Sequence, residues 1–129
     1  MADFQTLNQK YMPVIDTIKQ FEPYGAKFVG SELVGEQLHL KATVPSPVVA
    51  NRVWDAIKQV DPTYSDLMHE IETTGTVQEY TIAAGDNLSK VSKLFYGNAN
   101  KYEAIAKANH LENPDKIQVG QTIQIPALS

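Results

Sequence analysis

The amino-acid sequence predicts an α+β fold made of two small units that follow each other along the chain. Two kinds of periodicity lead to this prediction: alternating apolar and polar residues, typical of strands, and apolar residues spaced three or four apart, typical of helices. Residues 1–73 order these elements as αββαβ, whereas residues 79–129 order them as βααβ. A chain of 129 residues holds one medium domain or two small ones, so the change of order predicts a boundary between them.

The first predicted helix covers residues 3–21, and Pro13 interrupts it. A proline inside a helix removes a backbone donor, so Pro13 either kinks this helix or opens a second one. Glu22-Pro23-Tyr24-Gly25 ends the helical segment. The apolar residues at helical spacing are Phe4, Leu7, Tyr11, Ile15 and Ile18.

Two strands, at 28–34 and 37–44, follow the helix. Gly35 stands between them at the first central position of a tight turn, which favours a type II′ hairpin. The second strand alternates apolar and polar residues along its whole length, so one of its faces packs inward.

The last two elements of this unit are a helix from Ser46 to Val60 and a strand at 67–73. Ser46 is a good N-cap, and Pro47 suits the first helical turn. We expect this unit to have its own core around Ile15, Ile18, Leu38, Leu40, Val53, Trp54, Ile57 and Ile71.

The second unit begins with a strand at Tyr80–Ala83, which Gly85-Asp86 breaks. Asn87 is a good N-cap for the helix that follows, and Gly97-Asn98 ends that helix because both residues tolerate the left-handed conformation. A second helix follows, and strict alternation at 121–125 predicts the closing strand.

This segment, residues 80–126, resembles a LysM domain, a small module widely used to bind N-acetylglucosamine polymers such as peptidoglycan and chitin. The resemblance lies in the order of a strand, a GD-x-L turn, a YGN turn, a PDKI loop and a G-Q-x-I-x-I-P strand. It implies a shallow glycan groove between the loop after the first strand and the loop before the last. The residues placed there by resemblance are Gly85, Asp86, Asn87, Leu88, Asn113, Pro114, Asp115, Lys116 and Ile117.

The physical properties of these residues agree with a groove but also with a purely structural role. Gly85 lets a ligand approach the backbone, and a helix that starts at Asn87 offers unpaired amide donors. Pro114 and Ile117 supply apolar surface. The same fold, however, needs Leu88 and Ile117 as core and Asn87 as a cap, and the LysM family usually has Thr or Ser at the position of Asn87.

Residues 1–73 resemble a BON domain in the order of their elements, and residues 74–78 form a short polar linker to the LysM-like domain at 79–129. BON followed by LysM resembles a bacterial cytoplasmic family that includes a potassium-binding type. A potassium ion is therefore the one cofactor that the resemblance suggests, with main-chain carbonyls as its ligands. The loop Val60–Ser65 and the linker near Thr74 are the places where we expect such carbonyls.

Composition and charge exclude several partners. Residues 1–78 carry six basic and ten acidic side chains, and residues 79–129 carry five of each, so neither unit has the basic stripe that nucleic acid or an anionic membrane requires. No apolar run is long enough to span a bilayer. The first residues do not resemble a signal peptide, so we expect a cytoplasmic protein unless an export signal was removed. With no cysteine, disulfides and thiolate catalysis are excluded.

Few other side chains predict chemistry. Asp55, Asp61 and Asp66 suggest a carboxylate pair for glycoside cleavage, but nothing in the sequence positions them in a cleft, so we expect no enzyme and no catalytic residue. His39, His69 and His110 form no close metal-ligand pair, which favours structural roles. For Tyr96 and Tyr102 we favour packing over stacking on sugars.

These observations predict a non-enzymatic protein that binds N-acetylglucosamine-containing glycans. Two alternatives stay open at this point: a potassium-binding or potassium-sensing protein, and a structural or docking protein in a cell-envelope or phage-tail-like assembly.

Overall fold

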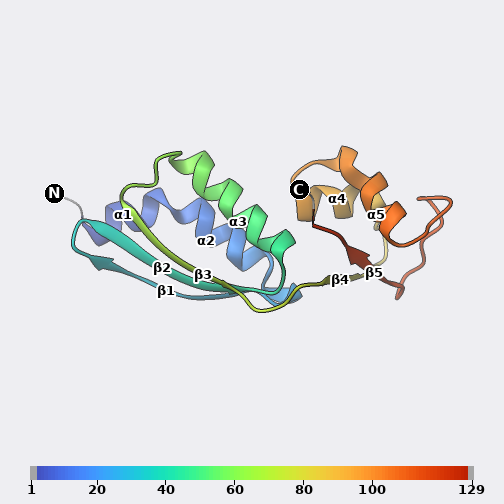
Figure 1. Ribbon diagram of the computed structural model, residues 1–129, viewed down its shortest axis with the longest axis horizontal. Coiled ribbons are helices and arrows are strands. Elements are labelled where there is room, and N and C mark those ends of the chain that lie inside the picture. Colours follow the sequence, from blue (N-terminus) through green and yellow to red (C-terminus); the bar gives the residue numbers. More distant parts are fainter. Residues whose placement is uncertain (1–2, 128–129) are drawn as a thin grey trace.

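The computed structural model describes residues 3–127, and it has the predicted α+β fold with two separate sheets. The sheets and their helices follow each other along the long axis of the molecule (Figure 1). Residues 1, 2, 128 and 129, which the predicted domain bounds include, lie outside the described residues.

The first helical segment is two helices and a short 3₁₀ turn. They are α1 (Phe4–Lys10), α2 (Met12–Gln20) and η1 (Glu22–Tyr24). Pro13 lies in the first turn of α2, where its missing N–H costs nothing, so it opens a second helix and does not kink a single one.

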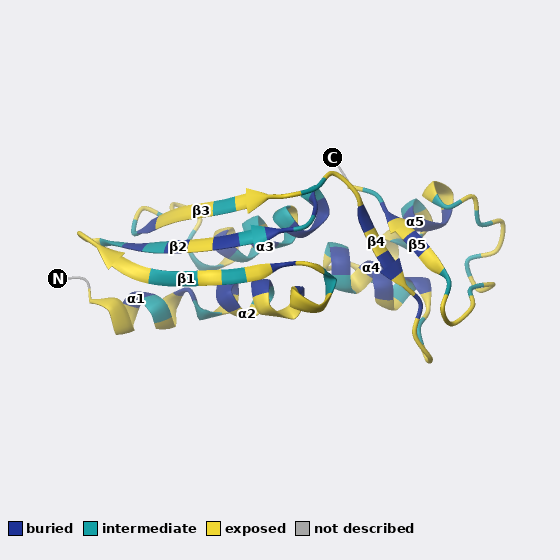
Figure 2. Ribbon diagram, turned by 90° about the horizontal axis from the view of Figure 1, so that it is seen from below, coloured by how far each residue is buried: buried dark blue, intermediate teal, exposed yellow. Residues whose placement is uncertain are grey.

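The first sheet has three strands, β1 (Lys27–Val34), β2 (Gln37–Val44) and β3 (Leu67–Thr73), in that spatial order. Strands β1 and β2 form the predicted hairpin and are antiparallel, and β3 pairs with β2 in parallel. Helix α3 (Pro47–Val60) makes the crossover between β2 and β3. The helices cover one face of this sheet and leave the other face open (Figures 1 and 2).

Most of the predicted core of this sheet is buried, but two of its residues are only partly covered. Trp54 and Ile71 pack against the core without being enclosed by it. Ile71 belongs to β3, which is an edge strand. Trp54 lies on the flank of α3, where its ring meets the His69 ring edge-on with the two centroids 4.5 Å apart. The predicted core residues that are buried are Ile15, Ile18, Leu38, Leu40, Val53 and Ile57.

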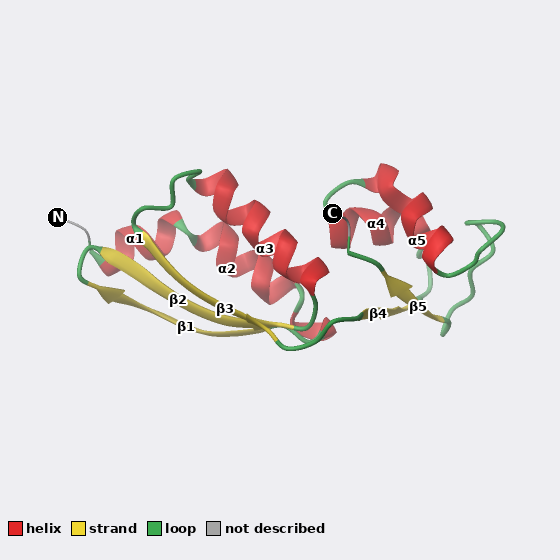
Figure 3. Cartoon of the chain, viewed as in Figure 1, coloured by secondary structure: helices red, strands yellow, loops and turns green. Residues whose placement is uncertain are grey.

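The second sheet is a pair of antiparallel strands, β4 (Gln78–Thr81) and β5 (Thr122–Ile125). Helix α4 (Leu88–Tyr96) and helix α5 (Tyr102–Ala108) cover one face of it, joined through the 3₁₀ turn η2 (Ala99–Lys101) (Figure 3). This is the predicted βααβ arrangement.

One strand is displaced from its predicted position. We predicted the first strand at Tyr80–Ala83, but the ladder begins two residues earlier, where Gln78 pairs with Ile125, and it ends at Thr81. The turn after the strand begins at once, because the amide of Ala83 already donates to the side chain of Asp86.

The two halves share a continuous apolar core. The ring centroids of Phe21 and Phe95 are 5.5 Å apart, and those of Tyr24 and Tyr80 are 5.6 Å apart. The linker is correspondingly close to the first half: a Cβ built on Gly75 would lie 2.6 Å from the carbonyl oxygen of Pro45.

Candidate functional site

The two loops that the sequence assigned to a groove meet at the start of α4. They enclose a cleft of about 410 Å³. Four of the nine predicted groove residues line this cleft: Asn87 and Leu88 on one side, and Pro114 and Asp115 on the other. Two further residues, Ser89 and Tyr102, complete the lining.

Asn87 positions the helix start that faces the cleft. Its backbone is extended, and its Oδ1 accepts a hydrogen bond of 2.9 Å from the amide of Lys90, so the predicted N-cap is confirmed. The cap satisfies the third amide of α4, whereas the amides of Leu88 and Ser89 have no acceptor inside the helix. The positive end of the helix dipole adds to their strength as donors toward a ligand oxygen.

Gly85 and Asp86 build the turn beside the cleft and do not line it. Gly85 has φ +86°, a conformation that favours glycine, and its carbonyl accepts from Nζ of Lys90 at 3.0 Å. The carboxylate of Asp86 accepts from the Tyr80 hydroxyl and from the amide of Ala83. Burial, and then the hydrogen bond to Asp86, raise the pKa of the Tyr80 hydroxyl above its ordinary value, as expected for a phenol that donates to a carboxylate.

In the second loop, too, some predicted residues build the turn and others line the cleft. The side chain of Asn113 accepts from the amide of Asp115 at 2.9 Å, and its carbonyl accepts from the amide of Lys116 at 3.0 Å. These hydrogen bonds form a local turn in which Pro114 and Asp115 line the cleft. Lys116 is exposed and Ile117 packs against the core, so neither lines the cleft.

Ser89 and Tyr102 were not among the predicted site residues. Ser89 lies in the first turn of α4, one residue beyond the GD-x-L motif, so its position followed from the motif once the helix start was known. Tyr102 packs against the core, as predicted, and also lines the cleft, so it is available for contact with a ligand as well. Sequence spacing does not separate these two roles of a tyrosine that begins a helix.

The chemistry of the lining suits a neutral polar ligand. Asp115 is the one charged side chain among the lining residues, and Asn87, Ser89 and the helix amides supply hydrogen-bonding groups. Leu88, Pro114 and the Tyr102 ring supply apolar surface. The cleft therefore offers hydrogen-bonding groups for the hydroxyl and amide groups of a ligand, beside apolar surface for a ring face.

The three aspartates considered for catalysis do not form a catalytic pair. Asp61 and Asp66 both bind Nζ of Lys10, at 2.9 and 2.6 Å, and Asp66 also accepts from the Tyr11 hydroxyl. The Lys10 contact holds the pKa of Asp61 well below its usual range, so this group is no general acid near neutral pH. Asp55 is exposed on α3, apart from this network.

No group of three or more potential metal ligands of the His, Asp or Glu type occurs among residues 3–127. His39 lies 3.5 Å from Glu32 on the sheet, and His69 packs on Trp54. In the loop where we expected carbonyls for potassium, the carbonyls of Asp61 and Tyr64 accept from the amides of Tyr64 and Leu67. At the linker, the amide and the hydroxyl of Thr74 both donate to the carbonyl of Val44 in β2.

Comparison with known proteins matches residues 80–126 to the family model of the LysM domain. Residues 80–126 are a LysM domain. The potassium binding protein Kbp of Escherichia coli O6:H1 is 53% identical over 51 residues, which are 38% of this chain and 34% of Kbp. The secreted LysM effector slp2 of Pyricularia oryzae is 39% identical over 57 residues, 44% of this chain and 19% of the effector. The esterase Rv1288 of Mycobacterium tuberculosis is 46% identical over 46 residues, 36% of this chain and 10% of the esterase.

The matched stretches thus span about a third or less of these relatives. The LysM family model covers residues 80–126, and the BON-like assignment of residues 1–73 and the linker bounds 74–78 stay predictions. Within the described part of the chain, no helix is both long enough and apolar enough to cross a membrane.

Proposed function

We propose that this chain is a non-enzymatic ligand-binding protein whose LysM domain binds N-acetylglucosamine-containing glycans of the peptidoglycan type. The observation that carries the proposal is the meeting of Asn87, Leu88 and Ser89 with Pro114 and Asp115 around one cleft at the start of α4. The LysM match supports the choice of glycan, because LysM is a module widely used to bind N-acetylglucosamine polymers. The LysM effector slp2 shares this segment.

The cleft explains how such a ligand would be held. The free amides at the start of α4 donate to an acetamido carbonyl oxygen, and Asp115 accepts from a sugar hydroxyl or amide N–H. Leu88, Pro114 and Tyr102 contact the apolar face of the sugar ring. Because an open cleft buries little area per sugar, we expect modest affinity that rises with the number of sugars.

Amide chemical shifts test this proposal directly. Titration of the labelled full chain with chitotetraose should shift the amide signals of 85–89 and 113–117 together. The shifts should follow one saturation curve, because both loops line one cleft. The proposal is wrong if chitotetraose at concentrations on the order of 1 mM moves neither set of signals.

A second candidate function is potassium binding, favoured by the 53% identity with Kbp over 51 residues. In this hypothesis main-chain carbonyls are the ligands, since they replace a hydration shell without adding charge. The segments Val60–Ser65 and the linker near Thr74 remain the proposed location, and a cytoplasmic location remains part of the same prediction.

Thermal unfolding in potassium chloride and in sodium chloride at equal ionic strength tests this second candidate. Potassium should raise the melting temperature more than sodium, because a ligand that binds only the folded, docked state stabilises it by mass action. Identical melting curves in the two salts would exclude it without affecting the glycan proposal.

A further inference from the structure

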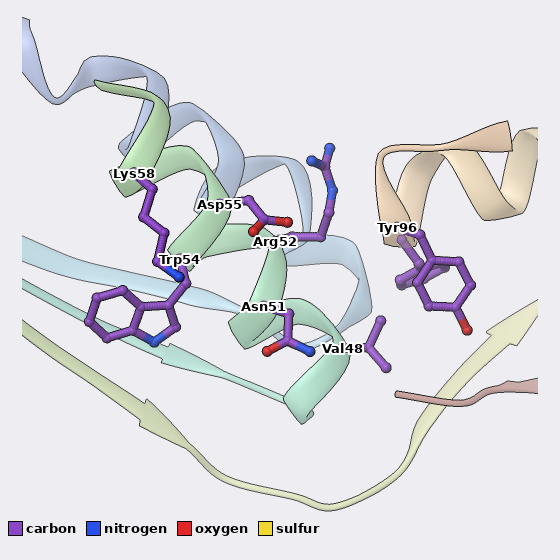
Figure 4. A pocket seen from close by; sticks show the side chains of 8 residues that line it. Val48, Asn51, Arg52, Trp54, Asp55, Lys58 and Tyr96 are labelled. Atoms are coloured by element: carbon purple, nitrogen blue, oxygen red, sulfur yellow. The ribbon is translucent and has the colours of Figure 1, made fainter. Parts of the chain in front are cut away.

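A second cleft, of about 400 Å³, lies between α3 and the last turn of α4. Helix α3 supplies four polar side chains together with Val48 and Trp54, and Tyr96 of the LysM domain lies on the other side (Figure 4). Phe95, also of the LysM domain, completes the lining. The glycan cleft lies at the first turn of α4 and this one at the last, so a nine-residue helix, about 13 Å long, separates them.

The polar side chains come from one stripe of α3. Asn51, Asp55 and Lys58 are spaced three or four residues apart, which puts them on neighbouring turns of one helix face, and Arg52 follows Asn51 at the edge of this face nearest α4. The side chains of Asn51, Asp55 and Lys58 have no hydrogen bond or ion pair with other residues in the described range 3–127. Their donors and acceptors are therefore free to meet a ligand.

Arg52 and Tyr96 are held in place beside this stripe. Nε of Arg52 donates to the carbonyl of Leu94 at 3.1 Å, which fixes the guanidinium and leaves its two terminal nitrogens for other acceptors. Gly97 gives it room, because a Cβ there would lie 3.0 Å from Nη1 of Arg52. The hydroxyl of Tyr96 donates to the carbonyl of Pro126, which fixes the orientation of its ring. A site with such held groups loses little conformational entropy when a ligand binds.

The mixture of charges decides what class of ligand fits. An anion would be attracted by Arg52 and Lys58 but repelled by Asp55, and a cation would meet the opposite pattern. A sugar hydroxyl both donates and accepts, so a row of hydroxyls satisfies Asp55 as an acceptor, Arg52 as a donor and Asn51 as both. Val48 and the Tyr96 ring add an apolar wall for the face of a sugar ring.

We propose that this cleft between α3 and α4 is a second saccharide site, formed jointly by the two halves of the chain. The inference rests on the proposed function only for the choice of sugar oligomers as probes, since the LysM cleft and this cleft share no lining residue. Recognition here uses hydroxyl groups and no acetamido group, so this site should accept glucose oligomers as well as N-acetylglucosamine oligomers.

The test is a chemical-shift titration of the labelled full chain with cellotetraose and, separately, with chitotetraose. We expect both sugars to shift the amide signals of 51–58 and 95–97. In the Asn51→Ala/Asp55→Ala double variant the dissociation constant from these signals should rise at least about tenfold, since two hydrogen-bonding side chains are lost. Asp16→Ala, an exposed aspartate of α2, is the matched control and should behave as wild type.

This experiment distinguishes the failure of one proposed site from the failure of the other. Shifts confined to 85–89 and 113–117 would overturn the second site and leave the LysM proposal standing. Shifts confined to 51–58 and 95–97 would support the second site and contradict the LysM proposal. The second site is also overturned if the double variant binds as wild type does, or if these signals respond to the dipeptide Ala-Ala and to neither sugar.

Discussion

Nε of Arg52 on α3 donates a 3.1 Å hydrogen bond to the carbonyl oxygen of Leu94, near the end of α4. The last carbonyls of a helix have no partner within it, and the helix dipole makes them attractive to a cation. The contact therefore gives the unpaired carbonyl of Leu94 a hydrogen-bond donor and connects the LysM domain to the first half of the chain.

Replacement of this arginine should weaken the whole molecule. Arg52→Ala removes a charge-assisted, partly buried hydrogen bond, so we expect the free energy of unfolding to fall by about 1–3 kcal/mol. Lys58→Ala, on the same helix but without a partner in the described part of the chain, should change it by less than about 0.5 kcal/mol. Urea unfolding of both variants checks this, and equal losses would show that the Leu94 contact contributes nothing.

The linker gives a second prediction about the contact between the halves. In Gly75→Ala the new methyl group would lie 2.6 Å from the carbonyl oxygen of Pro45, and backbone on both sides must move. We expect a loss of about 1–3 kcal/mol in unfolding free energy. Gly30→Ala is the matched control, because nothing lies within 4 Å of its added Cβ. A Gly75→Ala protein as stable as the Gly30→Ala protein would mean that the linker does not rest on Pro45.

Acid should weaken the network of Lys10 with Asp61 and Asp66. Hydrogen bonds from Lys10 and Thr63 lower the pKa of Asp61; for Asp66, burial raises the pKa, but hydrogen bonds from Lys10 and Tyr11 outweigh it. A carboxyl whose folded pKa is depressed stabilises the fold above its unfolded pKa, near 3.8, and this stability is lost as pH falls through the folded value.

Unfolding of wild type and Lys10→Met from about pH 7 down to about pH 2 measures this effect. Wild type should lose more stability over this range than the variant, so the difference between the two should shrink toward the acid end. Parallel curves would show that Lys10 does not depress the pKa of either aspartate in the folded protein. The Tyr11 hydrogen bond persists in the variant, so some dependence on pH should remain.

Local sequence signals predicted the elements well, because caps and turn residues act within a few positions. Asn87 caps α4, Gly97 ends it with φ +73°, and Pro13 opens α2. Contacts between distant segments left no such signal. Nothing near Arg52 indicates Leu94, 42 positions away, and the burial of Trp54 was overestimated because its helix flank faces an edge strand.

The candidate site was predicted as two loops, and only part of each loop lines the cleft. Glycine and asparagine at turns were the strongest signals, yet Gly85 and Asn113 build the turns and leave the lining to their neighbours. Ser89 and Tyr102 complete the lining through the packing of α4 against α5, which spacing in the sequence does not encode.

Glycan binding in the cleft at the start of α4 is tested most directly by a substitution that fills this cleft. Ser89→Trp places an indole among Asn87, Tyr102 and Pro114, whereas Ser65→Trp adds the same side chain at an exposed loop of the other half. The chitotetraose dissociation constant, measured from the amide signals of 85–87 and 115–117, should rise at least about tenfold in Ser89→Trp and stay unchanged in Ser65→Trp. Equal affinity of Ser89→Trp and wild type at these signals, with both proteins folded, would show that this cleft does not bind glycan.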